Sequence, residues 1–303
     1  MKRIVVTGGS GFVGRHCVTR LLERGYEVHL FSSQVRHSDN IHWHTVDLLD
    51  AAAVGRTMQS IQPSHLLHLA WITDPRSYSS APENLDWLSA SVQVLRAFHR
   101  HGGRRVVMSG SCAEYDWNHG WCSEQVTPLN PATLYGQCKH ALQSTLAAYS
   151  NLVGLSWAWG RLFFLYGPYG HPARMPGVVI KSLLRNEPAL CSHGHQIRDF
   201  MHVADAAHAL VTVLDSDMQG PINVASGEPV TVREIVEQIA DRIGRRDLVQ
   251  FGAVPTSPHD PPLLIADIRR LRTELNWQPA HTLVSGLEAT LECCKGELRG
   301  LSL

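Results

Sequence analysis

The sequence has no run of about 18 or more apolar residues, which a membrane-spanning helix would need. It also has no apolar N-terminal segment that ends in a small-residue cleavage site. Net charge is absent too, because 27 Lys and Arg balance 27 Asp and Glu, and no long basic run occurs. These absences exclude a membrane span and the electrostatic footprint of nucleic-acid binding. We expect a cytoplasmic protein whose partners are small molecules.

Disulfide and metal motifs are also missing. The 7 cysteines form no CxxC pair, and a chain of 303 residues is too long to depend on disulfides, so we predict reduced thiols. Histidines are numerous, at 18, and CSHGH brings Cys191, His193 and His195 close together in sequence. Alternate positions are the wrong spacing for paired helical ligands, and no second ligand cluster is evident. We therefore predict no metal site.

What the chain does have is an alternation of apolar runs and amphipathic stretches. A helical stripe, for example, runs through residues 85–98. Strands are predicted at 3–6, 27–31, 41–46, 65–70, 105–109 and 153–162. Strands and helices that alternate at this spacing are typical of βαβ units. We predict an α/β fold with a doubly wound parallel sheet, followed from about residue 165 by a smaller, more loop-rich α+β part.

A glycine-rich segment, TGGSGFVG at 7–14, follows the first predicted strand directly and precedes a helix. Gly8 and Gly11 would let the backbone turn tightly and approach a pyrophosphate, and Gly14 would let the helix pack on the strand. The N–H groups at the start of the helix would face the phosphate charge. In this strand–turn–helix context, the motif predicts a dinucleotide site.

The end of the second strand bears on the choice of dinucleotide. An NAD site usually has a carboxylate there for the ribose hydroxyls, but this chain has Phe31, Ser32, Ser33 and then Arg36. Hydroxyls and a guanidinium suit a 2′-phosphate, so we predict NADP in preference to NAD, with NAD still possible. The alternative is that Arg36 is a solvated loop residue. Asp47, after the third strand, is placed to meet the adenine or to cap a helix.

A Tyr and a Lys lie four residues apart in LYGQCK at 134–139. Asn130 and Pro131 are typical of a helix start, with Asn as the cap and Pro at the first helical position. Tyr135 and Lys139 would then share one helical face. Alone, these two residues could equally be a surface pair.

In combination, the motifs resemble those of the extended short-chain dehydrogenase/reductase family, which comprises nucleotide-sugar epimerases, dehydratases and reductases. The likeness covers nearly the whole chain. It rests on TGGSGFVG, HLAW (where the family has HLAA), SGSCAEY, YGQCK, RLFFLYGP, QIRDFMHVADAAHAL and NVASGEPVTVREI. The resemblance implies that Tyr135 transfers a proton and that its pKa is lowered for this task, partly by the charge of Lys139. It also implies that Ser111 hydrogen-bonds the reacting oxygen, with Ser109 as the alternative.

The residues after Ser111 separate the reactions of the family. The dehydratases carry Asp-Glu there, whereas this chain has Cys112 and Ala113, which disfavours dehydration. Glu114 is one place late, and on a strand-like segment one place turns a side chain to the other face, so we predict a structural role for it. GDP-L-fucose synthases resemble this chain in placing a Cys after the catalytic Ser and a His-Pro after YGP. Cys112 and His171 could therefore act as acid and base beside a keto group, although a small buried residue and an ordinary loop pair would look the same.

Substrate contacts are also implied by the resemblance. Arg198 corresponds to the family arginine that grips the substrate diphosphate, although it could instead pair with Asp199. Phe164 stands where the well-known epimerases have Asn, and PTSPHDPP offers only Ser257 where a second phosphate-binding Arg is expected. The expected substrate-binding residues are Phe164, Gln196 and Arg198. The expected cofactor-binding residues are Gly8, Gly11, Phe12, Val13, Gly14, Ser32, Ser33, Arg36, Asp47, Leu48, Leu69, Ala70, Tyr135 and Lys139.

The sequence as a whole predicts two functional parts. Residues 1–165 would form the dinucleotide-binding Rossmann domain, to which a segment at about 198–216 returns, and residues 166–303 would mainly bind substrate. By resemblance, the chain would be a homodimer that uses paired helices. We predict reduction of a nucleoside-diphosphate 4-keto-hexose by NADPH, with closest likeness to the CDP-sugar 4-ketoreductases. The alternatives are a redox-neutral NAD-dependent epimerase, a bifunctional epimerase/reductase and, more distantly, a non-catalytic cofactor-bound sensor.

Overall fold

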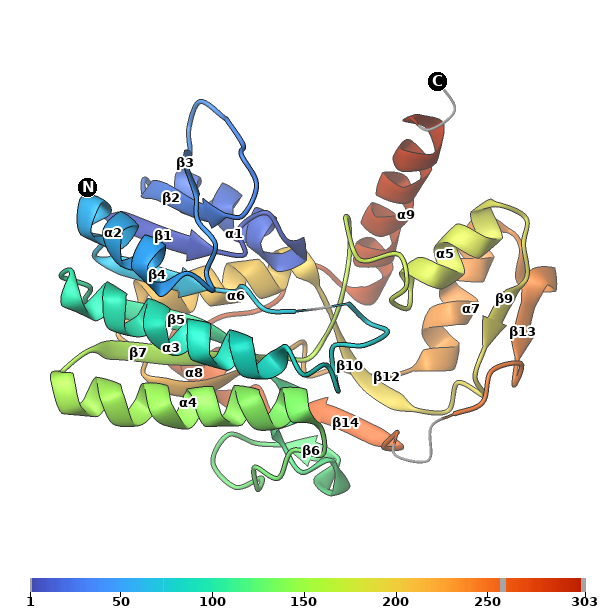
Figure 1. Ribbon diagram of the computed structural model, residues 1–303. Coiled ribbons are helices and arrows are strands. Elements are labelled where there is room, and N and C mark those ends of the chain that lie inside the picture. The colour runs from blue at the N-terminus through green and yellow to red at the C-terminus, as the bar shows by residue number, and fades with distance from the viewer. Residues whose placement is uncertain (1, 73, 257–259, 301–303) are drawn as a thin grey trace.

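The main sheet of the computed structural model has seven parallel strands, and the structure describes residues 2–72, 74–256 and 260–300. The strand order is β11-β7-β5-β4-β1-β2-β3, so β1 lies between β4 and β2 (Figure 1). The strands are β1 (Arg3–Thr7), β2 (Glu27–Ser32), β3 (His42–Thr45), β4 (His65–His68), β5 (Arg105–Ser111), β7 (Ser156–Leu162) and β11 (Gly220–Val224). This doubly wound sheet confirms the predicted fold class, and each of the six strands predicted for it is present.

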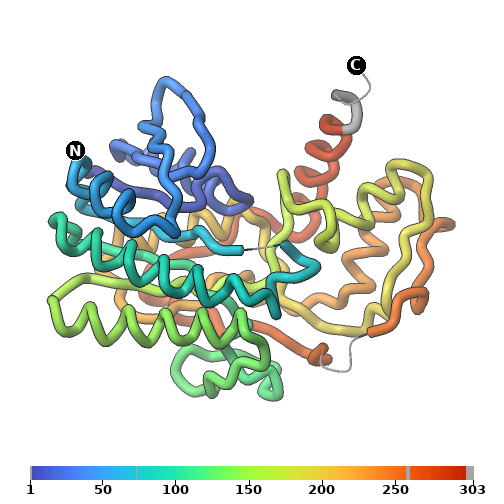
Figure 2. Tube along the Cα trace, viewed as in Figure 1, coloured from blue at the N-terminus to red at the C-terminus, as the bar shows by residue number. Residues whose placement is uncertain are grey.

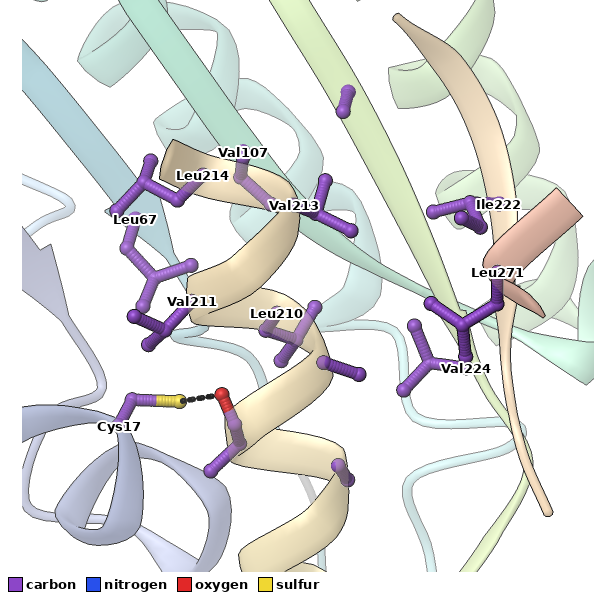
Figure 3. Packing of buried hydrophobic residues seen from close by; sticks show 14 of the residues in the cluster. Cys17, Leu67, Val107, Leu210, Val211, Val213, Leu214, Ile222, Val224 and Leu271 are labelled. Carbon is purple, nitrogen blue, oxygen red and sulfur yellow. Dashed lines mark hydrogen bonds between the residues drawn. The ribbon is translucent and has the colours of Figure 1, made fainter. Parts of the chain in front are cut away.

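Helices cover both faces of the sheet, which explains why the central strands β1, β4 and β5 have apolar, buried interiors. One face packs against α1 (Phe12–Glu23) and α6 (Val203–Asp215), and the other packs against α2 (Ala51–Ile61), α3 (Asn84–Arg100) and α4 (Leu134–Val153). Figure 3 shows how Leu210, Val211 and Leu214 of α6 reach the sheet, and how Cys17 of α1 lies against the α6 backbone. A short helix, α8 (Arg269–Leu275), covers β11 through Leu271.

The smaller part is built from a second sheet with the order β12-β10-β14-β6, with β8 also paired to β10. Its strands are β6 (Trp121–Cys122), β8 (Phe164–Tyr166), β10 (Ile197–His202), β12 (Pro229–Thr231) and β14 (Leu263–Ala266). A separate pair, β9 (Ala189–Cys191) and β13 (Val249–Phe251), and the helices α5 (Gly177–Leu184), α7 (Val232–Ile243) and α9 (Leu283–Gly300) complete it. These helices share a third apolar core with Tyr166 and Phe200.

The chain passes between the two parts more than once. Figure 2 shows it leave the main sheet after β7, return through α6 and β11, and leave again toward α7. The predicted returning segment at 198–216 contains α6, and the seventh strand, β11, lies beyond it. The functional division at residue 165 stays a prediction.

One predicted boundary is wrong. The helix that carries Tyr135 begins at Leu134 and not at Pro131, and its cap is Thr133, whose hydroxyl accepts the N–H of Gly136 at 3.1 Å. Both Asn130–Pro131 and Thr133 are good start signals, and only the contacts of the folded chain choose between them. Tyr135 and Lys139 still lie four residues apart on one helix, as predicted. Within the described ranges, no helix combines the length and apolarity needed to cross a membrane.

Candidate active site

The turn after β1 is shaped for a phosphate group. Gly8 has φ +69°, a conformation that favours glycine, and a Cβ there would lie 2.8 Å from the backbone N of Ala70. A Cβ on Gly14 would lie only 2.1 Å from the carbonyl oxygen of Gly8, so α1 packs against the turn only without a side chain. Gly11 precedes α1 and offers no side-chain cap. The first N–H groups of α1 therefore face the loop, and these residues fit the pyrophosphate of a dinucleotide.

Other predicted cofactor residues gather around this turn. Phe12 and Val13 form the start of α1, and Val13 packs into the core beneath it. Leu69 and Ala70 follow β4 and contact Gly8 through their backbone. The structure thus places the segments after β1 and β4 side by side, as the sequence predicts for neighbouring strands of one parallel sheet.

The loop after β2 carries the residues expected at the ribose end. Ser32 closes β2, and its hydroxyl accepts the N–H of Gln34 at 3.1 Å. Arg36 donates to the Gln34 side chain at 3.2 Å, and its guanidinium lies 5.7 Å from the ring centre of Trp43. Ser33 and Arg36 are exposed, so they are accessible to a ligand.

Asp47 and Leu48 follow β3, at the same end of the sheet as the loop after β2. Leu48 is buried, and the Asp47 carboxylate accepts the N–H of Leu49 at 3.0 Å. Capping of α2 falls to Asp50, which accepts from Ala52 and Ala53. The capping alternative for Asp47 is therefore wrong, and its adenine-contacting alternative stays a prediction.

Tyr135, Lys139 and Ser111 meet where α4 begins beneath the carboxyl end of β5. Ser111 is the last residue of β5, and its hydroxyl accepts the N–H of Ala113 at 3.2 Å. The Tyr135 ring stands edge-on to Trp71, at 6.3 Å, and to Tyr78, at 4.9 Å. The structure therefore brings the three predicted catalytic side chains together next to the segment after β4.

The pKa of Tyr135 is raised in the protein alone, whereas the resemblance implies that it is lowered. The first cause is burial, which penalises the phenolate, and the hydrogen bond with Ser111 opposes this effect. Tyr78, Glu114 and Cys112 raise the pKa further. The polypeptide by itself therefore keeps Tyr135 protonated.

Lys139 is 2% exposed, and its ammonium lies 6.0 Å from the ring centre of Tyr135. Its ammonium donates to the Ser109 carbonyl at 2.9 Å and lies 3.9 Å from the ring centre of Trp71. Burial lowers the pKa of Lys139 to about 7, and the Glu114 carboxylate opposes this shift. The face of Trp71 also favours the charged ammonium. Ser109, the alternative to Ser111, thus contributes its backbone to the lysine.

The lowered pKa of Lys139 predicts a dependence of stability on pH. Above pH 7 the folded protein releases the Lys139 proton, whereas an unfolded chain keeps it up to the ordinary lysine pKa of 10.5. The unfolded state then binds more protons, so the free energy of unfolding rises with pH across this window. We expect the wild type to gain stability relative to Lys139→Met between pH 7 and 10, measured by urea unfolding. A difference between the two proteins that stays constant with pH would contradict the assignment.

Glu114 has the structural role predicted for it, but it does not continue the strand. Residues Cys112–Glu114 form a 3-10 turn, and the Glu114 carboxylate accepts the N–H of Ser111 at 2.7 Å. It also pairs with Arg161 at 2.7 Å, and Glu114 and Arg161 are 0% and 1% exposed. Trp159 donates to both carboxylate oxygens at 3.0 Å. This buried network holds the backbone of Ser111 in place.

Cys112 and His171 lie in different surroundings. Cys112 is 7% exposed, and burial raises the pKa of its thiol, so the thiolate is disfavoured. His171 is exposed in the loop after β8, where its Nδ1 accepts the N–H of Ala173 at 3.2 Å. In the part of the chain that the structure describes, no contact joins the two side chains. Their joint role stays a prediction.

The predicted substrate residues do cluster. The Arg198 guanidinium is 4% exposed, lies 5.5 Å from the ring centre of Phe164 and donates to the Asp260 carboxylate at 2.5 Å. Gln196 donates to the same carboxylate at 3.0 Å. Asp199 instead accepts from Ser226, so the alternative pairing of Arg198 with Asp199 is wrong. Ser257 lies outside the described residues.

Sequence reasoning missed several residues of this site. Trp71 was noted only as a departure in HLAW, yet it packs over Lys139. Its indole N–H donates to the Asn84 side chain at 2.8 Å, and Asn84 in turn donates to the carbonyl of Tyr78 at 2.7 Å. Asp260 stands in a Pro-rich segment whose composition predicts only a loop. The departure at Trp71 was the one sequence signal that could have found any of them.

Comparison with known proteins agrees with this geometry. The chain is 29% identical over 317 residues to a UDP-glucose 4-epimerase of Mycolicibacterium smegmatis, and the match covers 96% of this chain and 97% of that protein. It is 26% identical over 319 residues to UDP-glucuronic acid decarboxylase 1 of Danio rerio, with 98% of this chain and 73% of that protein covered.

Solved structures give the same result. The Thermus thermophilus UDP-glucose 4-epimerase, in complex with NAD, superimposes with a TM-score of 0.86 at 27% identity, and the match covers 97% of this chain and 99% of that one. Residues 4–225 match the NAD dependent epimerase/dehydratase family. That match spans the glycine-rich turn, Ser111, Tyr135 and Lys139. The chain therefore belongs to the NAD dependent epimerase/dehydratase family, whose cofactor is an NAD-type dinucleotide.

Proposed function

We propose that the protein is a redox-neutral epimerase that acts on a nucleoside-diphosphate hexose and keeps its NAD. The observation that carries this proposal is the meeting of Tyr135, Lys139 and Ser111 at the end of β5, next to the turn formed by Gly8–Gly14. The relatives support it, since those named above are UDP-glucose 4-epimerases and a UDP-glucuronic acid decarboxylase. The substrate class would be UDP-hexoses. Epimerisation thus takes the place of 4-keto-sugar reduction, the function that the sequence alone predicts.

The residues of the chain would each have a defined task. NAD, when bound, would supply the acceptor and later the donor of a hydride. Tyr135, as the phenolate, would take the proton of the sugar hydroxyl at its oxygen and return it once the other face of the sugar is presented. Ser111 would hydrogen-bond the reacting oxygen, and the charge of Lys139 would favour the phenolate. The proton and the hydride both return to the sugar, so no external reductant is needed.

Incubation of the purified protein with UDP-glucose, without added cofactor, tests this proposal. We expect UDP-galactose to form, because the two sugars differ only in configuration at carbon four. The heat-denatured supernatant should contain NAD. Protein that contains NAD but converts no UDP-hexose would point to another base or sugar, and screening CDP, GDP and dTDP for thermal stabilisation would identify the base.

Reduction of a 4-keto sugar by NADPH is a second candidate, and the end of β2 favours it. Ser32, Ser33 and Arg36 offer hydroxyls and a guanidinium, and the sequence from Phe31 to Arg36 contains no carboxylate. A reductase must exchange its cofactor at every turnover, whereas an epimerase can retain it.

This second candidate predicts that NADPH binds more tightly than NADH and that Arg36→Ala narrows the difference. In the wild type, the Arg36 guanidinium would form a charge-assisted hydrogen bond with the 2′-phosphate of NADPH, and Arg36→Ala removes this bond. Dissociation constants from fluorescence titration of cofactor-free protein provide the measurement. Arg56→Ala, at an exposed arginine of α2, is the control and should leave the ratio unchanged. Equal constants for the two cofactors in the wild type would refute the NADP preference.

Arg198 is proposed to hold the substrate diphosphate, with Phe164 and Gln196 beside it. We expect Arg198→Lys to raise KM for the nucleotide sugar about 10-fold or more and to change kcat less, because a lysine cannot replace a two-pronged charged contact. Asp260→Asn is the matched control. It removes the carboxylate that now occupies Arg198, so KM should stay equal or fall. An unchanged KM in Arg198→Lys would remove Arg198 from the site.

We also propose that residues 1–165, with the returning segment, bind the cofactor and that residues 166–303 mainly bind substrate.

A homodimer through α3 and α4 is consistent with the leucine pattern. Leu95 is buried in the core, whereas Leu85 on the same helix is 56% exposed. Sedimentation equilibrium of the wild type and Leu85→Glu would test this interface.

A further inference from the structure

Histidine and glutamate side chains gather at the outer edge of the main sheet, away from the proposed active site. β2 and β3 pair in parallel, with His29 opposite His42 and Phe31 opposite His44. Since alternate residues of a strand share a face, Glu27 and His29 of β2 lie on the same face as His42 and His44 of β3. Figure 1 shows these two strands next to each other at the edge of the sheet. Three imidazoles and a carboxylate therefore line one edge.

The ligating atoms of three of these residues converge. One atom each from Glu27, His29 and His42 lies within 4.8 Å of the other two. Glu27 Oε1 and His29 Nε2 lie 3.1 Å apart. Tetrahedral ligands at zinc–ligand distances of about 2.0–2.1 Å are about 3.3 Å apart, so the ligating atoms would have to approach by on the order of 1 Å. The rings of His29 and His42 stack at 4.7 Å and 20°, so zinc binding would also require the His42 ring to rotate and turn a nitrogen toward the ion.

Neighbouring side chains hold two of these residues in place. His29 is 7% exposed, and its Nδ1 lies 3.0 Å from Nε2 of His44. An imidazole that binds a metal through one nitrogen usually donates from the other to such a partner. Arg3 donates to Glu27 Oε2 at 3.2 Å, which leaves Oε1 facing His29. His44 and Arg3 therefore support His29 and Glu27 from outside the group of three possible ligands.

We propose that Glu27, His29 and His42 bind a divalent cation of the zinc type, with a water molecule as the fourth ligand and with His44 as a positioning residue for His29. Two imidazoles and one carboxylate are a donor set that suits zinc. In the metal-bound form His29 carries its proton on Nδ1 and donates it to His44 Nε2.

The site would act on the segment that joins the two strands. Residues 33–41 leave β2 at Ser32 and end directly before His42, so an ion shared by β2 and β3 would fix that end of the segment. The same segment contains Ser33 and Arg36, which we expect near the ribose of the cofactor. The metal site itself does not depend on the proposed function, because its ligands lie at the other end of these parallel strands.

Calorimetric titration of EDTA-treated protein with zinc chloride tests the site. We expect one strong site in the wild type, and His42→Ala should lose it without loss of fold, since His42 is exposed. His44→Ala should weaken zinc binding about 10- to 100-fold, the usual effect of removing an outer partner of a ligand. Zinc should raise the melting temperature of the wild type but not that of His42→Ala.

A second histidine pair in the chain provides the control. His193 and His195 are exposed loop residues whose rings stack at 5.0 Å, and a double His193→Ala/His195→Ala variant should bind zinc like the wild type. Zinc affinity in His42→Ala equal to that of the wild type would overturn the proposal. So would loss of the strong site in the control variant alone.

Discussion

Replacing Tyr135 with phenylalanine should lower kcat about 100-fold or more and leave the fold and cofactor binding intact. The change removes one hydroxyl, and positioned acid–base catalysis contributes about 10²–10⁴-fold to a rate. The ring that packs edge-on against Trp71 and Tyr78 remains, so the start of α4 should not move. Turnover of the nucleotide sugar and the dissociation constant of the cofactor provide the two measurements.

Tyr149→Phe is the matched control for this variant. Tyr149 lies on the same helix, and its ring packs edge-on against His99. The same atom is deleted, so the control should keep wild-type turnover. More than about a tenth of wild-type activity in Tyr135→Phe would contradict the role of its phenol.

The second large effect is expected on stability. Glu114→Gln should lower the free energy of unfolding by about 3–5 kcal/mol, because it leaves the Arg161 guanidinium buried without a countercharge. Ser111 loses part of its support in the same variant, since the Glu114 carboxylate accepts its N–H. Equilibrium unfolding in urea provides the measurement.

Glu274→Gln is the control for Glu114→Gln. Glu274 also pairs with an arginine, Arg270, but its side chain is 44% exposed and the pair joins neighbouring turns of α8. Such pairs are worth about 0.3–0.5 kcal/mol. A cost below about 1 kcal/mol for Glu114→Gln would mean that the buried ion pair does not organise the turn after β5.

Local patterns in the sequence predicted the main sheet and the face that Tyr135 and Lys139 share. The glycine turn was readable because only glycine fits at Gly8 and Gly14, and the helix spacing was readable even though its start was misplaced by three residues. The predicted roles of these residues, however, still rest on the resemblance and await the variants above.

Contacts between distant residues were not predictable in this way. Glu114 meets Arg161 from β7, and Arg198 meets Asp260 across a Pro-rich segment. Neither pair leaves a periodic signal in a single sequence. The sequence therefore placed Glu114 on a strand, and it suggested Asp199, in place of Asp260, as the alternative partner of Arg198. The proposed metal site at Glu27, His29 and His42 is a similar case. Its residues become neighbours only because β2 and β3 pair in one register.

The choice between epimerase and reductase depends on the fate of the cofactor. The hydroxyls and the guanidinium after β2 would suit NADP, whereas two of the relatives named above are UDP-glucose 4-epimerases. Both proposed reactions would use the same Tyr135, Lys139 and Ser111. The geometry of the proton-transferring groups therefore does not separate them, whereas the redox balance of the reaction does.

The most direct test is to incubate purified protein with UDP-glucose in the absence of added cofactor and to follow the sugar by proton NMR. We predict that UDP-galactose accumulates to equilibrium, that Tyr135→Phe forms it at least about 100-fold more slowly, and that the wild-type protein retains NAD throughout. The contradicting result is no conversion of any UDP-hexose, together with consumption of added NADPH when a nucleoside-diphosphate 4-keto sugar is supplied.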